Sequence, residues 1–354
     1  MHKLYGGLVK NHAVSLLGPK GCEDFVAAGS DVKSTAVSPT PIFLLLTLIK
    51  GISGRISKGA ADIVMGGSGL VGPVVILLAK ISAAKSILLL HGLDIIADSR
   101  IYQWVFVPFL KHADLVICNS KNTARLAVEH GVDADKIVIV NPGVNINVAT
   151  MPHALAKQQR GLQGKTVLLS VGRLMPRKGL AEFVEHCFVN LAAADNDLLL
   201  LVVGSEPAQA LNRPKESVLT RIEAAVASQG VSEQVMLLGH ADDDDLAILY
   251  AAADVFVFPL IEMRGDVEGF GMVAVEAAVH GTPTVAFDCG GVSDAVVDGV
   301  NGALVDADDY AGFGNAIKRV VEADMRDSAR KFAGQFSWDN YCAQVEQGIQ
   351  KVLK

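Results

Sequence analysis

Two glutamates with seven residues between them form the most distinctive pattern in this sequence. Glu268 stands directly before Gly269-Phe270-Gly271, and Glu276 follows. The glycines are expected to open a helix, whose unpaired backbone N–H groups can bind an anionic or hydroxyl-rich ligand. Because helical residues are about 100° apart, the two carboxylates differ by roughly 80° on a helical projection and can approach one ligand.

Each glutamate also has an ordinary structural interpretation. Glu268 could be a loop or capping carboxylate, and Glu276 could lie on a solvated helix face. The neighbours of Glu276 are apolar, however, and a carboxylate in such surroundings needs a partner, such as the vicinal hydroxyls of a sugar. Since a strand is predicted at Val255–Phe258 just upstream, the functional interpretation is favoured.

A pair of cations follows another predicted strand. The run Thr166–Val171 leads into Gly172 and Arg173, and Lys178-Gly179 precede a helical segment. Two cations at the end of a strand, beside a helix N-terminus, suit a phosphate group. A single loop cation is normally just solvated, and the P-loop pattern is absent, so the prediction depends on the paired placement.

A histidine lies at the tip of a third apolar run. Leu88–Leu90 delivers His91, which Gly92 and Asp94 follow. A strand-end histidine near a carboxylate can bind a substrate or orient a proton. Taken alone, such a histidine is more often structural.

The elements that must position these residues alternate between strands and helices. The predicted strands are continuous apolar runs, which suits parallel strands buried on both faces. They are expected at Asp62–Met65, Ser86–Leu90, Leu115–Cys118, Lys136–Val140, Thr166–Val171, Leu198–Val203, Val235–Leu238, Val255–Phe258 and Thr284–Phe287. Helices are expected between them, among others at Asn122–Glu129, Leu180–Ala194, Ser217–Ser228 and Asp243–Ala252. The repeated β–α–β pattern predicts an α/β protein with doubly wound sheets.

The chain is long enough for two domains. Its 354 residues exceed the usual 100–200 for one domain. The boundary is expected in the segment 145–163, after the turn sequence Asn141-Pro142-Gly143, which gives domains at 1–150 and 160–337. A last helix over 338–354 has no strand after it and is expected to pack back on the first domain.

Composition narrows the setting. The five cysteines are widely spaced without a CxxC pair, which favours a reducing, cytoplasmic compartment over a disulfide framework or zinc site. No run reaches the roughly 18 apolar residues that a membrane span needs, and no signal peptide is seen. A nucleic-acid partner is disfavoured, since the pI is about 5.7 and no basic cluster with interleaved aromatic residues occurs.

The charge is distributed unevenly. Residues 1–150 carry 14 Lys and Arg against 10 Asp and Glu, a net charge of +4, while the whole chain has a net charge of −7. Apolar helices are expected around 42–57 and 101–111 in this basic half. The combination predicts peripheral contact with an anionic membrane surface, although ordinary variation in surface charge would explain it equally well.

These patterns together resemble glycosyltransferase family 4, the group 1 glycosyltransferases. The segment from Glu268 to Glu276 resembles the family's glutamate–seven residues–glutamate motif, and Arg173 with Lys178 resembles its phosphate-clamping pair. His91 is similar to the histidine of the family's N-terminal domain. The resemblance covers almost the whole chain. It implies the GT-B architecture, with two Rossmann-like domains facing each other across a cleft.

The resemblance also implies roles for individual residues. Arg173, Lys178, His91 and Glu268 would be the catalytic set. The donor-binding residues would be Gly7, Gly172, Gly204, Leu238, Phe270, Gly271, Met272 and Glu276, with Glu276 on the ribose and backbone amides on the sugar. The family generally needs no metal, so the resemblance implies neither a metal nor another cofactor. The four-aspartate run Asp242–Asp245 opens a predicted helix, where acidic residues suit the helix dipole.

The implied activity is that of a retaining hexosyltransferase in polysaccharide or glycolipid biosynthesis. The nucleotide sugar would be GDP-mannose, slightly favoured by the loop Asp266–Gly271, or a UDP-hexose, and the acceptor a glycan or lipid-linked intermediate. The alternatives are a nucleotide-sugar epimerase of the same fold and a truncated, non-catalytic nucleotide-sugar-binding protein.

Two departures from the family pattern bear on these alternatives. Members usually begin with a strand before a Gly-Gly loop, whereas only Met1–Tyr5 precede Gly6-Gly7 here, so the first strand is expected to be missing or very short. In addition, Glu206 stands where the family commonly has a glycine, which would place a carboxylate near the phosphates.

Overall fold

The computed structural model describes residues 1–27, 29–207 and 216–354, and the chain divides into two compact units. The first unit comprises Met1–Gly143 and Trp338–Lys354, and the second comprises Val144–Ser337. The second unit thus begins before the expected residue 160. The reason is helix α8 (His153–Gln159), which packs on helix α12 (Asp243–Ala252) of the second unit.

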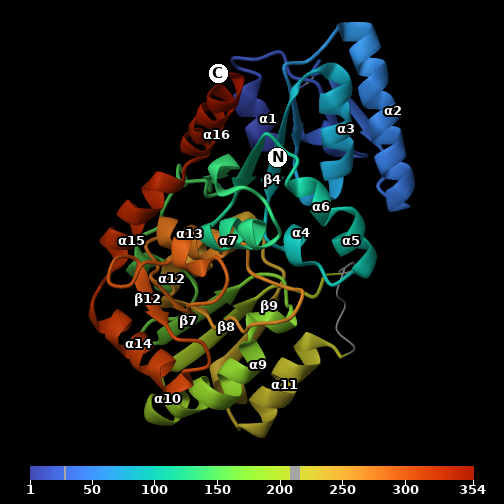
Figure 1. Ribbon diagram of the computed structural model, residues 1–354. Helices are drawn as coiled ribbons and strands as arrows, with labels where there is room; N and C mark the ends of the chain where they lie inside the picture. Colours follow the sequence, from blue (N-terminus) through green and yellow to red (C-terminus); the bar gives the residue numbers. More distant parts are fainter. Residues whose placement is uncertain (28, 208–215) are drawn as a thin grey trace. The chain divides into compact units, whose positions relative to one another are not determined.

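The first unit is built on a four-stranded parallel sheet in the order β3-β4-β5-β6 (Figure 1). Its strands are β3 (Ile63–Gly66), β4 (Lys85–Leu90), β5 (Leu115–Cys118) and β6 (Ile137–Ile139). Two further strands, β1 (Leu16–Pro19) and β2 (Val32–Thr35), form a separate parallel pair. Each strand of the main sheet therefore lies beside the next one in the chain.

Helices cover both faces of this sheet. They are α1 (His2–Leu8), α2 (Thr40–Lys58), α3 (Gly72–Ser82), α4 (Leu93–Ile96), α5 (Arg100–Val105), α6 (Val107–Leu110), α7 (Lys121–Glu129) and α16 (Trp338–Leu353), with short helical turns η1 (Cys22–Phe25), η2 (Gly69–Val71) and η3 (Ala134–Lys136). Alternate residues of β4 point to opposite cores: Leu88 and Leu90 join α3, α6 and α7, whereas Ile87 and Leu89 join α1 and α16. Because both faces are covered, the strand is one continuous apolar run.

The second unit contains a six-stranded parallel sheet in the order β12-β11-β10-β7-β8-β9. Its strands are β7 (Thr166–Val171), β8 (Leu198–Val203), β9 (Val235–Gly239), β10 (Val255–Phe258), β11 (Thr284–Phe287) and β12 (Gly302–Val305). The chain begins in the middle with β7, runs outward to β9, then returns to β10 beside β7 and runs outward again. This is the Rossmann order, in which the strand order reverses between the first and fourth strands.

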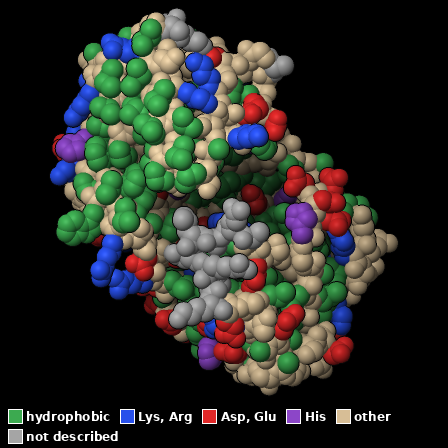
Figure 2. Space-filling model, turned by 90° about the vertical axis from the view of Figure 1, so that its right-hand side faces the viewer, with side chains coloured by type: hydrophobic (Ala, Val, Ile, Leu, Met, Phe, Trp, Pro, Cys, Tyr) green, Lys and Arg blue, Asp and Glu red, His purple; other side chains and the backbone are tan. Residues whose placement is uncertain are grey.

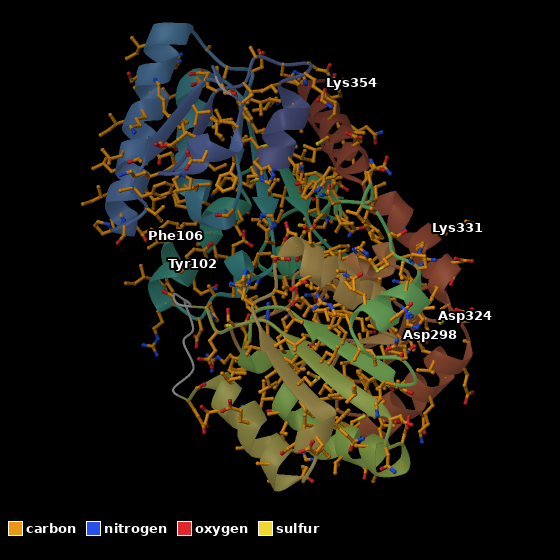
Figure 3. The ribbon with its side chains drawn as sticks, turned by 180° about the vertical axis from the view of Figure 1, so that it is seen from behind. Tyr102, Phe106, Asp298, Asp324, Lys331 and Lys354 are labelled. Atoms are coloured by element: carbon orange, nitrogen blue, oxygen red, sulfur yellow. The ribbon has the colours of Figure 1, made fainter. Side chains whose placement is uncertain are left out.

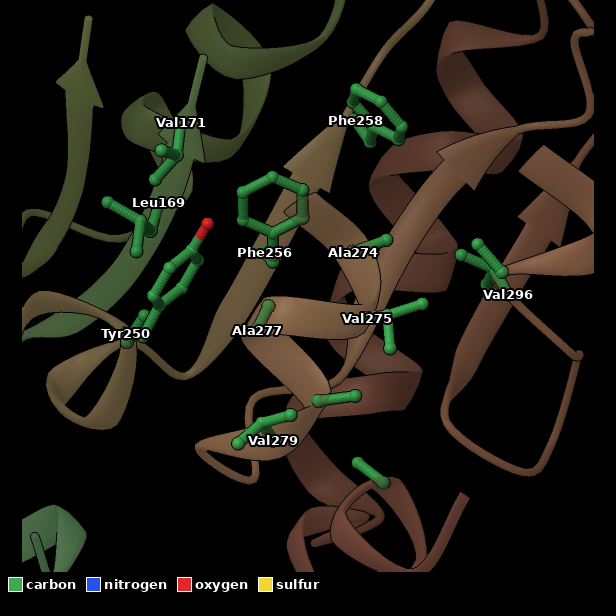
Figure 4. Close-up of a cluster of buried hydrophobic side chains, with 14 of the residues drawn as sticks. Leu169, Val171, Tyr250, Phe256, Phe258, Ala274, Val275, Ala277, Val279 and Val296 are labelled. Atoms are coloured by element: carbon green, nitrogen blue, oxygen red, sulfur yellow. The ribbon is translucent and has the colours of Figure 1, made fainter. Parts of the chain in front are cut away.

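The helices of the second unit pack on both faces of its sheet. They are α8, α9 (Leu180–Phe183), the π-helical segment η5 (Val184–Phe188), α10 (Val189–Ala194), α11 (Val218–Ser228), α12, α13 (Met272–Val279), α14 (Tyr310–Glu322) and α15 (Arg326–Ala333), with short turns η4 (Pro176–Lys178), η6 (Ser232–Gln234), η7 (Val292–Asp294) and η8 (Gly334–Phe336). One of its two cores joins α12 and α13 to one sheet face, where Tyr250 and Phe256 lie beside Ala277 (Figure 4). The predicted two-domain α/β fold is confirmed.

Three strands were not predicted, and the glycine pair near the N-terminus does not form the Gly-Gly loop that is usual in the family. Strands β1, β2 and β12 are short, and none of them is an unbroken buried run, so they lack the pattern that marked the others. Gly6 and Gly7 lie inside helix α1 rather than in a loop. A Cβ on Gly7 would come within 2.5 Å of Cys342 Sγ in α16, so close helix packing explains this glycine.

Candidate functional site

The carboxyl ends of β7 and β10, the neighbouring strands at the reversal point of the second sheet, hold the residues of greatest interest. The segment after β7 contains Gly172, Arg173 and Lys178, and the loop after β10 leads to Glu268. Ligands of such sheets bind outside the carboxyl ends of the strands at this point. The fold therefore brings together two patterns that are about 90 residues apart in the sequence, as the separation of Lys178 and Glu268 shows.

The two segments are tied to each other by backbone contacts. The N–H of Ile261 donates to the carbonyl oxygen of Arg177 at 3.0 Å. Gly179 adopts a φ of +62°, and a Cβ there would lie 2.0 Å from the carbonyl oxygen of Pro259. Only glycine permits both the left-handed backbone and this close approach. The position of Lys178 relative to the second loop is thus fixed by main chain.

A compact group of four charged side chains forms at this junction. Lys178 Nζ donates to Glu268 Oε2 at 2.8 Å, and Arg177 Nη2 lies 3.2 Å from the same oxygen. Arg177 Nε lies 3.2 Å from Asp266 Oδ1. The four side chains are only 10–15% exposed, and Lys178 Nζ lies 4.5 Å from the centre of the Phe258 ring. Arg173, by contrast, is exposed.

Burial and charge act in opposite directions on Glu268. Burial alone would raise the pKa of its carboxyl, but Lys178 and Arg177, together with Arg173, hold that pKa below its ordinary value. Burial lowers the pKa of the Lys178 ammonium, and Glu268 opposes this change. The 2.8 Å hydrogen bond favours the charged form of both groups, so Glu268 is held as a carboxylate.

Three glycines let the backbone close up beside this group. Gly172 and Gly204 have φ values of +140° and +143°, and a Cβ on Gly204 would lie 1.9 Å from the carbonyl oxygen of Gly172. The N–H of Gly204 donates to the carbonyl of Gly239 at 2.7 Å. The strand ends of β7, β8 and β9 therefore meet without intervening side chains, and Lys178 Cε lies 3.7 Å from the position of a Cβ on Gly172.

The second glutamate of the pattern lies in a different environment. Glu276 belongs to helix α13, which begins after Gly271 (φ +95°), and its Oε2 accepts a hydrogen bond from the Tyr250 hydroxyl at 3.3 Å. Burial raises the pKa of Glu276 above its ordinary value, and Tyr250 opposes that rise only in part. The two glutamates thus share a motif but not a charge environment.

The remaining predicted donor-site residues differ in exposure. Met272 at the start of α13 and Leu238 in β9 are 37% and 38% exposed, so both can meet a ligand. Phe270 is 2% exposed and packs against Phe336, with ring centres 5.5 Å apart, so only its backbone is available. Glu206 accepts hydrogen bonds from Ser217 and from the N–H of Leu219 at the start of α11.

His91 belongs to the first unit, where it follows β4 and is exposed. Its Nε2 lies 3.1 Å from the carbonyl oxygen of Gly67, so this nitrogen carries a proton, and in the neutral ring Nδ1 is an acceptor. Asp94 supports the turn, because its carboxylate accepts from the N–H groups of His91 and Gly69 at 2.8 and 2.9 Å. Tyr102, which stacks on Phe106, donates to the Asp94 carbonyl at 2.8 Å (Figure 3).

Sequence reasoning missed two residues of this region. Arg177 is 8% exposed and pairs with Asp266 and Glu268, but in the sequence it is one more basic residue in a loop. Tyr250 lies in α12, and its hydrogen bond to Glu276 arises only when α12 and α13 pack together.

Among the described residues, no three His, Cys, Asp or Glu side chains form a metal-binding group. In the four-aspartate run, Asp242 caps α12 by accepting from the N–H of Asp245.

Two family models match the chain. The model described as "Glycosyl transferases group 1" matches residues 154–335, and the model described as "Glycosyltransferase Family 4" matches residues 1–148. Among curated relatives, the D-inositol 3-phosphate glycosyltransferase of Geodermatophilus obscurus is 34% identical over 64% of this chain and 50% of its own length. That of Mycolicibacterium smegmatis is 32% identical over 64% of this chain and 50% of its own length. The chain spans about half the length of these relatives.

Solved structures share the fold over nearly the whole chain. HepE of Anabaena in complex with UDP has a TM-score of 0.79 at 21% identity, covering 99% of this chain and 96% of that one. Sucrose-phosphate synthase of Thermosynechococcus elongatus has a TM-score of 0.70 at 25% identity, covering 92% and 82%.

Proposed function

The chain belongs to the group 1 glycosyltransferases, and on that basis we propose that it transfers a hexose from a nucleotide-diphosphate sugar to a glycan or lipid-linked acceptor. The observation that carries this proposal is the buried pair of Lys178 and Glu268 at the reversal point of the second sheet. A cation and a carboxylate side by side can bind the two parts of such a donor, its diphosphate and its sugar hydroxyls.

In the proposed reaction, Lys178 and Arg173 bind the diphosphate. The bond between the sugar's anomeric carbon and the phosphate oxygen breaks, and its electron pair stays on the phosphate. The acceptor hydroxyl forms the new bond on the same face, with retention, and its proton passes to the departing phosphate. The negative charge that develops on the leaving group is stabilised by the cations, a term that often dominates catalysis. The low exposure of Lys178 strengthens this electrostatic stabilisation, because water screens the charge of its ammonium group less.

The carboxylates hold the rest of the donor. Glu268, kept ionised by its cationic neighbours, accepts hydrogen bonds from hydroxyls of the sugar, and the backbone amides around Gly271 and Met272 complete that contact. Glu276 binds the ribose hydroxyls. His91 of the first unit acts near the transferred sugar.

Two observations favour different donors. The loop Asp266–Gly271 favours GDP-mannose, whereas HepE, a structural neighbour, binds UDP and UDP-glucose. A thermal-shift panel with GDP, UDP, GDP-mannose, UDP-glucose and UDP-N-acetylglucosamine distinguishes them. A ligand at 100 times its dissociation constant stabilises a protein by about 2.7 kcal/mol, which is readily measured.

The outcomes of the panel separate the candidate functions. Stabilisation by one nucleotide and its sugar conjugate supports the transferase and names the base. Conjugate binding followed by epimerised or hydrolysed sugar, without any acceptor, would indicate the epimerase instead. No stabilisation by any of the five compounds would contradict a working donor site and favour a non-catalytic protein.

We further propose that the first unit docks on an anionic membrane surface, which would place the enzyme at the cytoplasmic face of the membrane. Helices α2, α3, α5 and α6 form one connected group, since α2 contacts α3, and α6 contacts both α3 and α5. Several of their large apolar side chains are exposed, above all Trp104 at 84%, Ile56 at 82% and Ile101 at 73%. Hydrophobic side chains gather over this face in Figure 2.

The charges of these helices match such a surface. The segments 40–56, 72–85 and 100–112 contain no Asp or Glu, and they carry Lys50, Arg55, Lys80, Lys85, Arg100 and Lys111. Exposed apolar side chains among basic ones are typical of segments that lie in a membrane interface. Each Lys or Arg near an anionic membrane contributes about 1 kcal/mol. Among the described residues, no helix is long and apolar enough to cross a bilayer.

A further inference from the structure

Arg177 is a buried cation to which neither the sequence pattern nor the proposed reaction gives a role. Its side chain is only 10% exposed, and its Nε and Nη1 make no hydrogen bond with the described residues. Its charge is met by two carboxylates, Asp266 at Nε and Glu268 at Nη2, both 3.2 Å away. A buried guanidinium is costly unless it is paired, so this placement needs an explanation.

Glu268 has two cationic partners, but one of them has a second task. Lys178 and Arg177 both contact the same oxygen, Oε2. In the proposed reaction, Lys178 also binds the donor's diphosphate, and a lysine ammonium is a single compact charge that two anions would share. If Lys178 were the only partner, its movement toward the phosphates would leave the Glu268 carboxylate without a neighbouring positive charge. That carboxylate is only 15% exposed, so leaving it unpaired would be costly.

Arg177 cannot follow Lys178 in such a movement. Its carbonyl oxygen is held by the N–H of Ile261, and its guanidinium is held by Asp266 as well as by Glu268. The planar guanidinium is suited to bridge two carboxylates, and it keeps its proton at all relevant pH values.

We propose that Arg177 is a positioning residue of the donor site: it is the permanent counter-ion of Glu268, held in place by Asp266, and it frees Lys178 to bind the diphosphate. The role of Lys178 in this inference rests on the proposed function. The pairing of Arg177 with Glu268 does not, so the two can fail separately. The low pKa of Glu268, to which Arg177 contributes together with Lys178, agrees with the proposal.

The direct test is the pKa of Glu268 in the ligand-free protein. It can be followed by carbon-13 NMR of the glutamate carboxyls, with the signal assigned through E268Q. In R177Q we expect this pKa to rise by about 1 unit or more, the usual effect of one opposite charge at this distance. The matched control is R319Q, which breaks an exposed arginine–aspartate pair in the same unit, Arg319 with Asp298 at 3.0 Å, and should leave the pKa unchanged.

The conservative variant R177K keeps the test decisive if R177Q does not fold. A lysine keeps the charge but cannot bridge both carboxylates, so we expect a smaller rise of roughly half a unit. An unchanged Glu268 pKa in the variants that fold would overturn the proposal, and Arg177 would then serve only to tie the two loops together.

A second measurement tests whether Arg177 frees Lys178. By calorimetry, R177Q should bind UDP or GDP, whichever the wild type binds, about 10-fold more weakly, because Lys178 stays on Glu268. Adding E268Q to R177Q removes this competitor and should recover most of the affinity. A double variant as weak as R177Q would overturn the freeing of Lys178. If the wild type binds neither nucleotide, the proposed function fails, while the NMR result still decides the pairing.

Discussion

At the scale of single residues, the two glutamates of the motif show how position changes chemistry. Cationic neighbours hold the pKa of Glu268 low in spite of its burial. Burial raises the pKa of Glu276, whose carboxyl accepts a hydrogen bond from the Tyr250 hydroxyl. A carboxylate surrounded by cations suits a site next to a diphosphate. A carboxyl group in an apolar pocket suits neutral hydroxyl groups, such as those of a ribose, which satisfy it without a net charge.

The Tyr250 hydroxyl provides a test of this second environment. Y250F removes the hydroxyl that donates to Glu276, and a typical intramolecular hydrogen bond is worth about 1 kcal/mol. We expect the KM for the donor sugar to rise by about 5-fold with kcat nearly unchanged, because the contact concerns binding of the ribose rather than the reacting bond. Steady-state kinetics with varied donor measures both.

The control for this variant is Y310F. Tyr310 lies in α14 against Phe287, with ring centres 5.2 Å apart, in the other core of the same unit. An equal change of KM in Y310F, or a fall in kcat alone in Y250F, would contradict the role given to the Tyr250 hydroxyl.

At the scale of elements, the site depends on how closely the strand ends approach one another. Gly204 is the critical point, since its φ of +143° and its contact with the carbonyl oxygen of Gly172 leave no room for a side chain. This contact holds the turn after β8 against the turn that leads from β7 to Arg173 and Lys178.

G204A is therefore expected to be severely destabilising. Strained backbone costs about 1–3 kcal/mol, and the clash with backbone atoms adds to it, so we expect a loss of at least 3 kcal/mol in the free energy of unfolding. G230A is the matched control: Gly230 also has a positive φ, +69°, but a Cβ there meets nothing within 4 Å. It should lose only about 1–2 kcal/mol. Urea unfolding of both variants measures the difference, and similar losses would contradict the packing argument.

The strands also show which elements can be predicted from the sequence. The buried strands of the main sheets were predictable because both faces are covered and the apolar run is unbroken, as in Leu198–Val203. Strand β2, with the sequence VKST, is nowhere fully buried and gave no such pattern. The helical position of Gly7 could not be predicted, because Cys342, against which it packs, is more than 300 residues away. Arg177 could not be recognised in the sequence either, because its burial and its pairing with Asp266 and Glu268 depend on packing between distant segments of the chain.

At the scale of the whole molecule, charge and apolar exposure are divided between the two halves of the chain. The first 150 residues have a net charge of +4 in a chain whose net charge is −7. The apolar, acid-free helices α2, α3, α5 and α6 all belong to the first unit. This division is the basis for the proposed membrane contact.

Liposome co-sedimentation tests that contact. The wild type should bind vesicles that contain anionic lipid at low salt and lose part of the binding at high salt, where charges are screened beyond about 3 Å at 1 M. The double variant I101S/W104S should bind several-fold less. As a control, V300S/V321S replaces two exposed apolar residues of the second unit and should bind like the wild type. Absence of binding at low salt would refute the proposal.

Calorimetric titration of the nucleotide identified by the thermal-shift panel into wild type, K178A and K318A shows whether Lys178 binds the donor. Lys318 is an exposed lysine of α14 in the same unit and serves as the control. If Lys178 binds the donor's diphosphate, K178A should bind about 10- to 100-fold more weakly, the range for a charged hydrogen bond, while K318A should match the wild type. Equal affinities for wild type and a folded K178A would contradict a donor site at the junction of β7 and β10.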